Sequence, residues 1–230
     1  AYTWSHSIDT ASNDFGGGGF ATLYDSERGN SDYDVRHNLN VSGSYLLPAP
    51  KDSFLTAAFK NWYTDFMFTA RAGTSFDIVG VSTTSSAGAG GLGQGLFAQV
   101  RPDYNGQLVW LVDTTVPGAQ RLNRAAFDSP SGYAQGNLGR NAPRGLGLTQ
   151  LDVSLRRRID VGDHGALHLS VSALNVMNHP SFANPSRNEG ANMNSVNFGI
   201  STRTQAGGGF GSLYQSGGPR SLEFVLRYQF

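Results

Sequence analysis

The sequence predicts an all-β chain: an antiparallel, up-and-down segment of a transmembrane β-barrel, with about six long strands, long outer loops and short inner turns. Six segments alternate apolar and polar residues with a period of two, which places every second side chain on one sheet face. Apart from the short first one, these segments have about 10 to 13 residues. A membrane-crossing strand needs about 9 to 11, whereas a strand in a globular protein usually has about 5 to 6. The connections between the segments also alternate between long and short.

The apolar positions can be read off in chain order. In the first three segments they are Tyr2, Trp4, His6 and Ile8, then Val35, Leu39, Val41, Tyr45 and Leu47, then Trp62, Phe66, Phe68, Ala70 and Ala72. In the last three they are Leu151, Val153, Leu155, Ile159 and Val161, then Leu167, Leu169, Val171 and Ala173, then Leu222, Phe224, Leu226, Tyr228 and Phe230. An ordinary antiparallel sandwich shows the same alternation, so the pattern alone leaves a soluble β protein as the alternative.

The connections favour the membrane barrel. Residues 162–165 form a tight turn and residues 48–60 a modest link, whereas residues 9–34, 74–148 and 179–219 form long connections. The order is therefore long, short, long, short, long, which matches the long extracellular loops and short periplasmic turns of outer-membrane barrels. If the long loops face outward, the last segment runs inward and ends at the periplasmic face.

The composition excludes several classes of protein. The chain has 230 residues, with 17 Lys plus Arg and 17 Asp plus Glu, so it has no overall positive field for nucleic acid. It has no Cys, which excludes disulfide scaffolds and thiolate metal sites. No segment approaches the roughly 20 apolar residues of a membrane-spanning helix. The first residues lack a signal-peptide pattern, so we expect the chain to begin after processing or inside a larger protein.

The last segment carries a more specific pattern. Phe224, Leu226, Tyr228 and Phe230 occupy alternate positions and end on an aromatic residue. This pattern resembles the C-terminal assembly signal of bacterial outer-membrane barrels, in which a strand with one apolar face is paired by the assembly machinery through β-augmentation. The alternative is an ordinary edge strand.

Several further stretches resemble Oar-like TonB-dependent transporters, in the order of that family and across the whole chain. They are residues 2–9 (YTWSHSID), 31–37 (SDYDVRH), 101–106 (RPDYNG), 123–127 (NRAAF), 136–141 (GNLGRN) with Arg144 and Gly145, and 175–182 (NVMNHPSF). The resemblance implies a bacterial outer-membrane protein without enzymatic activity or cofactor, which imports a bulky solute. It also implies outer-membrane lipid, the barrel-assembly machinery and the inner-membrane TonB complex as partners.

Transporters of this kind also have a plug, an N-terminal domain and a barrel of about 22 strands. A six-stranded sheet leaves two edges whose backbone groups cannot be satisfied in lipid. We therefore expect residues 1–230 to be the C-terminal portion of a barrel, with the plug and the N-terminal domains absent.

Two groups of residues are candidates for contact with solute or plug. The first group comprises charged residues expected on the lumen-facing side of the strands: Arg36, Asp65, Arg71, Asp152, Arg156, Arg158, Asp160, His168, Glu223 and Arg227. The second comprises aromatic residues of the long connections: Tyr104, Trp110, Phe127, Tyr133, Phe182 and Phe198. The simpler interpretation, which we favour for both, is solvation and cross-strand pairing for the charges and packing between loops for the aromatics.

Other chemistry has little support in the sequence. None of the five His residues has a partner at metal-ligand spacing, and neither a nucleophile elbow nor a Walker loop is present. The only basic cluster is Arg156, Arg157 and Arg158, whose side chains would point to alternating faces of a strand. The alternatives to a transporter are a small β-scaffold binding or adhesion protein that presents long surface loops, and a secreted β-sandwich hydrolase.

Overall fold

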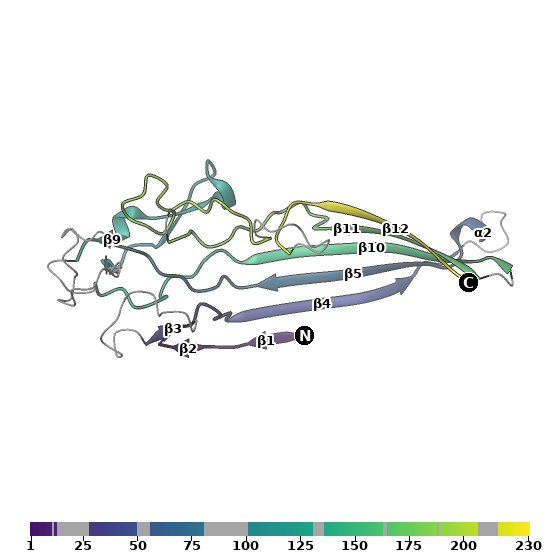
Figure 1. Ribbon diagram of the computed structural model, residues 1–230, viewed down its shortest axis with the longest axis horizontal. Helices are drawn as coiled ribbons and strands as arrows, with labels where there is room; N and C mark the ends of the chain where they lie inside the picture. Colours follow the sequence, from purple (N-terminus) through teal and green to yellow (C-terminus); the bar gives the residue numbers. More distant parts are fainter. Residues whose placement is uncertain are drawn as a thin grey trace.

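The computed structural model contains one six-stranded antiparallel sheet, in which the spatial order of the strands follows their order along the chain (Figure 1). It describes residues 1–10, 12, 28–49, 56–80, 101–130, 136–162, 165–187, 189–206 and 216–230. The six strands are β1 (Tyr2–Trp4), β4 (His37–Leu46), β5 (Trp62–Arg71), β10 (Leu148–Asp160), β11 (Ala166–Leu174) and β12 (Ser221–Gln229). The predicted all-β, up-and-down antiparallel architecture is confirmed.

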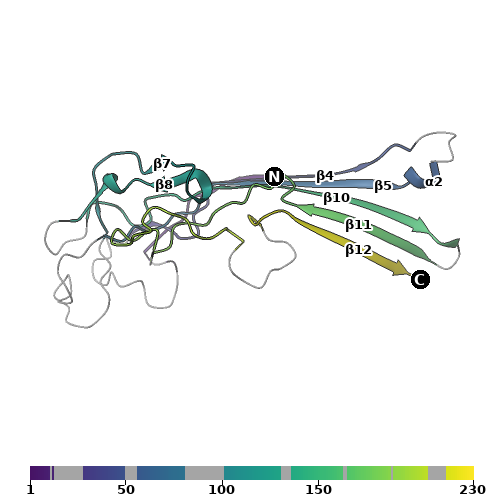
Figure 2. The same ribbon diagram turned by 90° about the horizontal axis from the view of Figure 1, so that it is seen from above.

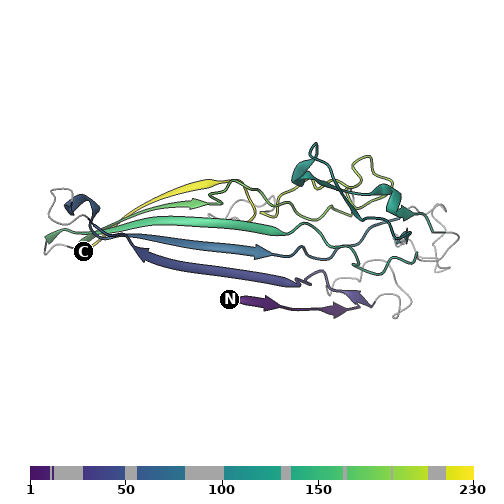
Figure 3. The same ribbon diagram turned by 180° about the vertical axis from the view of Figure 1, so that it is seen from behind.

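The sheet is open within the described residues: β1 pairs only with β4, and β12 pairs only with β11. Strands β10, β11 and β12 fan away from β4 and β5 when the molecule is seen from above, so the sheet is curved and not flat (Figure 2). The three long connections lie at one end of the sheet, and the two short ones lie at the other end, where the C-terminus is also found (Figures 1 and 3). This distribution agrees with the predicted alternation of long and short connections.

The first segment differs from its prediction. Its pairing in the main sheet ends at Trp4, and the next strand, β2 (Ile8–Asp9), pairs instead with β3 (Gly29–Asn30) in a separate two-stranded ladder. Beyond Trp4, the backbone N–H of Ser5 donates to the carbonyl of Arg36, the Ser5 hydroxyl donates to the carbonyl of Val35, and the backbone N–H of Ser7 donates to the Asp34 carboxylate. His6 and Ile8 therefore leave the sheet face predicted for them.

The two faces of the main sheet differ in chemistry. One cross-strand row on the first face contains Tyr45, Thr64, Leu155, Val171 and Phe224. The neighbouring row on the opposite face contains Ser44, Asp65, Ser154, Ser172 and Glu223. Large side chains of the first face are exposed, including Phe224 at 73% and Leu226 at 66%. We call these faces the apolar face and the polar face.

The hydrophobic core lies in the loops and not under the sheet. Its buried residues are Phe76, Ile78, Leu122, Ala126, Phe127, Leu138, Ala191, Met193 and Phe198. They are held by two small ladders, β6 (Asp103–Tyr104) with β9 (Phe127–Asp128) and β7 (Trp110–Val112) with β8 (Gln120–Leu122), and by the 3₁₀ turns η1 (Pro117–Ala119) and η2 (Arg124–Ala126). We call this compact end of the molecule the loop unit. A soluble sandwich would bury its main sheet, whereas here the apolar face has no protein layer over it among the described residues.

The shorter connections are built more simply. A one-turn helix, α2 (Thr56–Phe59), precedes β5, and Gly162 and Gly165 take positive φ values of 54° and 129° in the tight turn between β10 and β11. In that turn, a Cβ on Gly165 would come within 2.1 Å of the carbonyl oxygen of Gln229 in β12, so only Gly fits. None of the helices in the described part of the chain has the length and apolar character needed to cross a membrane.

The difference between the faces predicts opposite responses of two adjacent residues on β5. Phe66 and Met67 are 42% and 49% exposed, but they lie on the apolar and the polar face respectively. We expect Phe66→Arg to lower the free energy of unfolding in lipid by about 2–4 kcal/mol, because it places a charge in hydrocarbon near mid-depth. The matched variant Met67→Arg is expected to change it by less than about 1 kcal/mol. Urea unfolding in vesicles measures both, and equal effects would contradict the assignment of the faces.

Candidate functional site

A buried carboxylate lies just before β4, where the first long connection ends. Asp34 precedes β4 and is 1% exposed. Its carboxylate accepts hydrogen bonds from the backbone N–H of Ser7 at 2.9 Å and from Nε of Arg36 at 3.0 Å, and it forms an ion pair with Arg144. Arg144 lies 110 positions away in the sequence and also donates to the backbone carbonyl of Asp34. This contact joins the first long connection to the second.

The electrostatics of Asp34 favour its charged form. Burial by itself raises the pKa of this carboxyl, but the hydrogen bonds from Ser7, Arg36 and Arg144 outweigh burial and lower the pKa from 3.8 to about 2. Two cations therefore compensate one buried anion, which is the condition under which such a charge is stable inside a protein.

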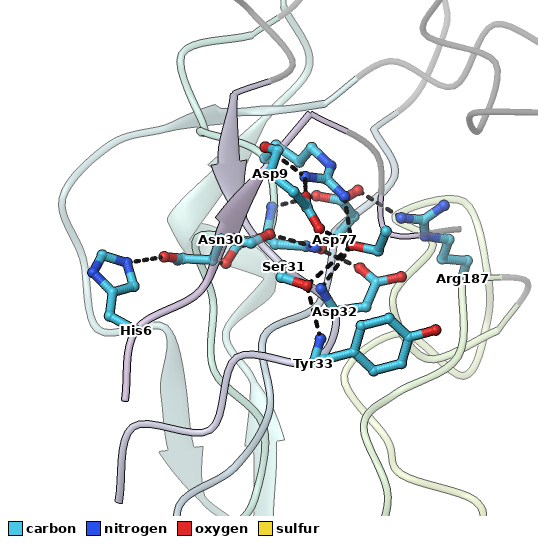
Figure 4. Close-up of polar contacts among 11 residues, drawn as sticks. His6, Asp9, Asn30, Ser31, Asp32, Tyr33, Asp77 and Arg187 are labelled. Atoms are coloured by element: carbon cyan, nitrogen blue, oxygen red, sulfur yellow. Dashed lines mark hydrogen bonds and ion pairs between the residues drawn. The ribbon is translucent and has the colours of Figure 1, made fainter. Parts of the chain in front are cut away.

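A second cluster surrounds Asn141, which is 0% exposed and has a φ of 51°. Figure 4 labels Asn30, Asp77 and Arg187 of this cluster. Its backbone N–H donates to Asp77 at 2.6 Å, and its side-chain amide donates to the carbonyl of Asn30 at 2.9 Å. Asp77 is 2% exposed and also accepts from Arg187 at 2.7 Å. Asn141 and Asp77, both in the second long connection, thus bind the first connection through Asn30 and the third through Arg187.

A third contact closes the network beside β2. The guanidinium of Arg140 forms an ion pair with Asp9 and donates to the hydroxyl of Ser12 at 2.8 Å. Burial raises the pKa of Asp9, but hydrogen bonds from Arg140, Ser31 and Ser12 outweigh it, so the net shift is downward. The stretches 31–37 and 136–145 therefore supply part of the buried polar frame of the loop unit, and Asp9, Asp77 and Arg187 complete it.

The last long connection fastens the loop unit to the polar face of the sheet. Arg71, at the outer end of β5, donates to Oε1 of Gln205 at 2.8 Å. The backbone N–H of Gly217 donates to Oε1 of Gln150 at 2.7 Å, and Asn175 donates to the carbonyl of Gly218 at 2.7 Å. Leu148 and Gln150 are consequently only 2% and 5% exposed. The outer end of the polar face is covered by this connection.

Farther inward, the polar face carries exposed charge pairs. Arg156 forms an ion pair with Asp65 at 2.6 Å, and its guanidinium lies 5.1 Å from the ring centre of Tyr63. Arg158 pairs with Asp160 at 2.8 Å, and both side chains are more than 60% exposed. Such exposed pairs contribute about 1 kcal/mol or less each, so they solvate this face more than they stabilise it.

Most of the charged residues proposed for the polar face lie there. Asp65, Arg71, Asp152, Arg156, Arg158, Asp160, His168, Glu223 and Arg227 share one side of the sheet by register. Asp152 accepts the backbone N–H of Asn175 at 2.8 Å, and Arg227 lies directly opposite His168. Arg36 was expected on this face, but it precedes β4 and belongs to the Asp34 cluster, because the strand begins at His37, two residues after the Val35 with which the predicted segment starts.

The loop aromatics are mostly packing residues. Phe127 is 0% exposed, so the structure corrects the expectation that its side chain is available to a ligand. The rings of Tyr104 and Phe198 lie 6.0 and 6.3 Å from Phe127, and the indole N–H of Trp110 donates to the carbonyl of Arg144 at 2.8 Å. Phe182 is partly buried, and Tyr133 lies outside the described residues.

The C-terminal pattern is on the open edge strand. Phe224, Leu226 and Tyr228 all lie on the apolar face of β12 and are 73%, 66% and 49% exposed, and the terminal Phe230 is fully exposed. The Tyr228 and Phe230 rings are 6.3 Å apart. This strand offers both an unpaired edge and an apolar face, as an assembly signal requires.

The polar network itself was not anticipated from the sequence. Asp9, Asp34, Arg140 and Arg144 lie inside the stretches 2–9, 31–37 and 136–145, whereas Asp77 and Arg187 lie in none of the stretches quoted above. No group of three or more His, Asp or Glu in the described part of the chain is arranged to hold a metal ion.

Comparison with known proteins gives one positive result. A family model described as an outer membrane beta barrel domain matches residues 1–222, which covers five of the main-sheet strands and the start of β12. No curated protein and no solved structure matches the chain.

The lowered pKa of Asp34 predicts acid sensitivity of the loop unit. A carboxyl whose pKa is lower in the folded state contributes stability above its unfolded value, near 3.8, and this contribution is lost as the pH falls toward about 2. We expect the loop unit to lose on the order of 2 kcal/mol across this window. Fluorescence of Trp110, in a background in which Trp4 and Trp62 are replaced by Phe, measures the loss during urea unfolding at a series of pH values. Asp34→Asn should remove most of this dependence, and an unchanged slope in that variant would contradict the assignment.

Proposed function

Because the chain belongs to the outer membrane β-barrel domain family and is therefore a protein of the bacterial outer membrane, we propose that it forms the C-terminal barrel part of a TonB-dependent, Oar-like transporter for a bulky solute. The observation that carries this proposal is the open, curved meander of six strands with a lipid-compatible face and a charged face. Further barrel strands must pair with the edges of β1 and β12, because unpaired backbone groups are too costly in hydrocarbon.

The loop unit supports a receptor more than a simple pore. Its frame consists of buried ion pairs and amide contacts that connect all three long connections, so the extracellular end has a fixed shape. A large preformed surface of this kind suits the recognition of a bulky solute outside the cell. The path of the solute would be lined by the polar face, both at its covered outer end and along its charged inner part. A plug supplied by the rest of the protein would line the same path.

The first experiment concerns the gene. The reading frame upstream of Ala1 is expected to encode further barrel strands, a plug and a TonB-interacting segment. The complete gene product, extracted in detergent, is then expected to be retained by the immobilised periplasmic domain of TonB, while residues 1–230 alone are not. A start codon and signal peptide directly before Ala1 would overturn the proposal.

The alternative is a binding or adhesion protein that presents its loops on a β scaffold. The observation that favours this alternative is the compact, packed core of the loop unit. The energy dependence of solute uptake distinguishes a transporter from an adhesion protein. Solute accumulation by a transporter stops when a protonophore collapses the inner-membrane potential, whereas binding by an adhesin continues.

A further inference from the structure

One strand of the loop unit has an open edge. Among the described residues, β7 pairs only with β8, in an antiparallel hairpin. Just after β7, the backbone N–H of Asp113 donates to the carbonyl of Ala119 at 3.0 Å, which fixes the residues of the hairpin that bond to each other. Because alternate residues of such a ladder face the partner strand, Trp110 and Val112 direct their N–H and C=O groups to the other side.

The opposite edge of the same hairpin is already paired with main chain. The backbone N–H of Leu122 in β8 donates to the carbonyl of Gly199 in the third long connection at 3.0 Å. Gly199 has a φ of 88°, and a Cβ there would lie only 2.8 Å from the carbonyl oxygen of Leu122, so backbone lies directly against backbone. The β8 edge thus receives a backbone segment, whereas the part of the chain that the structure describes supplies none to the β7 edge.

The side chains along the open edge are apolar and exposed. Val112 is 82% exposed, Leu111 is 40% exposed and the preceding Leu108 is 74% exposed. The edge is nevertheless held in place, because the Trp110 ring packs on Phe76 with its centre 6.2 Å away. A fixed strand edge with exposed apolar side chains is a template on which another chain can pair.

The surroundings of the edge are neutral and lie beside the sheet. The nearest charges, Asp113 and Arg121, form an ion pair with each other at 3.2 Å. In the turn of the hairpin, a Cβ on Gly118 would lie 2.8 Å from Leu146, which precedes β10, and 3.1 Å from Phe182 of the third connection. The hairpin therefore lies near the outer end of the sheet, where Figure 2 labels β7 and β8.

An extended backbone is the chemical partner that this edge fits. Trp110 and Val112 each offer one donor and one acceptor, and these repeat every two residues, or about 6.7 Å. A peptide strand presents donors and acceptors with the same repeat, and strand addition is a common mode of peptide recognition. The neutral surroundings favour an uncharged peptide, and the apolar side chains favour apolar residues in it.

We propose that the open edge of β7 binds an uncharged, extended peptide by strand addition. Trp110 and Val112 form the main-chain hydrogen bonds, and Leu111 and Val112 contact the apolar side chains of the peptide. This deepens the proposed receptor function by naming peptides as the class of solute, and it rests on that function for import alone. Binding at the edge is therefore measured without transport.

The main-chain donor of Val112 can be removed without touching the hairpin. The full protein is reconstituted into nanodiscs and titrated with a fluorescent, end-capped peptide of alternating Thr and Val, whose anisotropy reports binding. We expect Val112→Pro to weaken binding about tenfold or more, because proline has no N–H and is accepted where the N–H faces away from the partner strand. The matched variant Val112→Thr, which keeps the N–H, should weaken it by less than about threefold. Near-ultraviolet circular dichroism checks that the loop unit stays folded.

The peptide supplies a second test that needs no variant of the protein. N-methylation of its backbone nitrogens removes the donors but keeps the apolar side chains, so binding should again fall about tenfold or more. Equal binding of the methylated and unmethylated peptides would show adsorption to an apolar surface and overturn strand addition. Equal binding by Val112→Pro and the unsubstituted protein, or by empty nanodiscs, would also overturn it.

Two further results distinguish this site from other interpretations. If the protein dimerises without peptide and Val112→Pro makes it monomeric, the edge serves a second copy, which contradicts the proposal. Peptide binding at the edge without energy-dependent uptake would support the site and contradict the transporter. Energy-dependent uptake of another solute, without peptide binding, would contradict the site and leave the transporter intact.

Discussion

Replacement of Asp34 by Asn is expected to lower the free energy of unfolding of the loop unit by about 2–4 kcal/mol. The substitution keeps the shape of the side chain but removes the anion that compensates Arg36 and Arg144, whose guanidinium groups are only 28% and 29% exposed. An unpaired, partly buried cation costs more than the lost hydrogen bonds alone. Limited proteolysis of the loops and urea unfolding followed by Trp110 fluorescence both measure the change.

The control for this variant is Asp113→Asn in the same loop unit. Asp113 and its partner Arg121 are 20% and 40% exposed, whereas the Asp34 side chain is fully buried, so water can reach Arg121 when the Asp113 charge is removed. The unfolding midpoint of Asp113→Asn should therefore move much less. Heat-modifiable migration of the barrel strands should be unaffected in both variants. If Asp34→Asn and Asp113→Asn behave alike, the buried carboxylate does not hold the connections together.

Truncation of Phe127 to Ala is expected to destabilise the loop unit by about 3–5 kcal/mol. Phe127 is fully buried at the centre of the loop core, between Tyr104 and Phe198, so the substitution leaves a cavity that the β6–β9 ladder cannot close. Near-ultraviolet circular dichroism and protease sensitivity should report loosened aromatic packing while the barrel strands remain folded.

The comparison for Phe127→Ala is Leu108→Ala, because Leu108 belongs to the same loop but is 74% exposed. That variant should change the stability by less than about 0.5 kcal/mol. A small effect of Phe127→Ala would mean that the loop core contributes little, and the loop unit would then be a set of independent loops.

The strands were predictable because the environment of a membrane strand imposes a rule on each residue. Val153 must face lipid and Ser154 must face the polar side, so apolar and polar residues alternate along the sequence of β10. The same rule failed at the first segment, where Ile8 and Asp9 pair with residues 29 and 30 and not with the main sheet. The alternation also failed at Arg36, which precedes β4 and forms an ion pair with Asp34.

The loop unit was not predictable in the same way. Asp34 and Arg144 are 110 positions apart, as are Asp77 and Arg187, and no local period relates them. The core residue Phe127 is an aromatic in a long, Gly-rich connection, and its sequence gives no sign whether it faces a ligand or a neighbouring loop. Such contacts follow from the three connections meeting at one end of the sheet, which only the topology reveals.

The central claim is that the apolar face of the sheet touches lipid. The chain has no Cys, so single Cys residues can be placed at adjacent positions of β10 by Val153→Cys and Ser154→Cys. Each is labelled with the same fluorophore after folding into vesicles that contain spin-labelled acyl chains. The account predicts strong quenching at position 153 and little at position 154. Little quenching at position 153, as for a side chain enclosed by a second layer of protein, would contradict it.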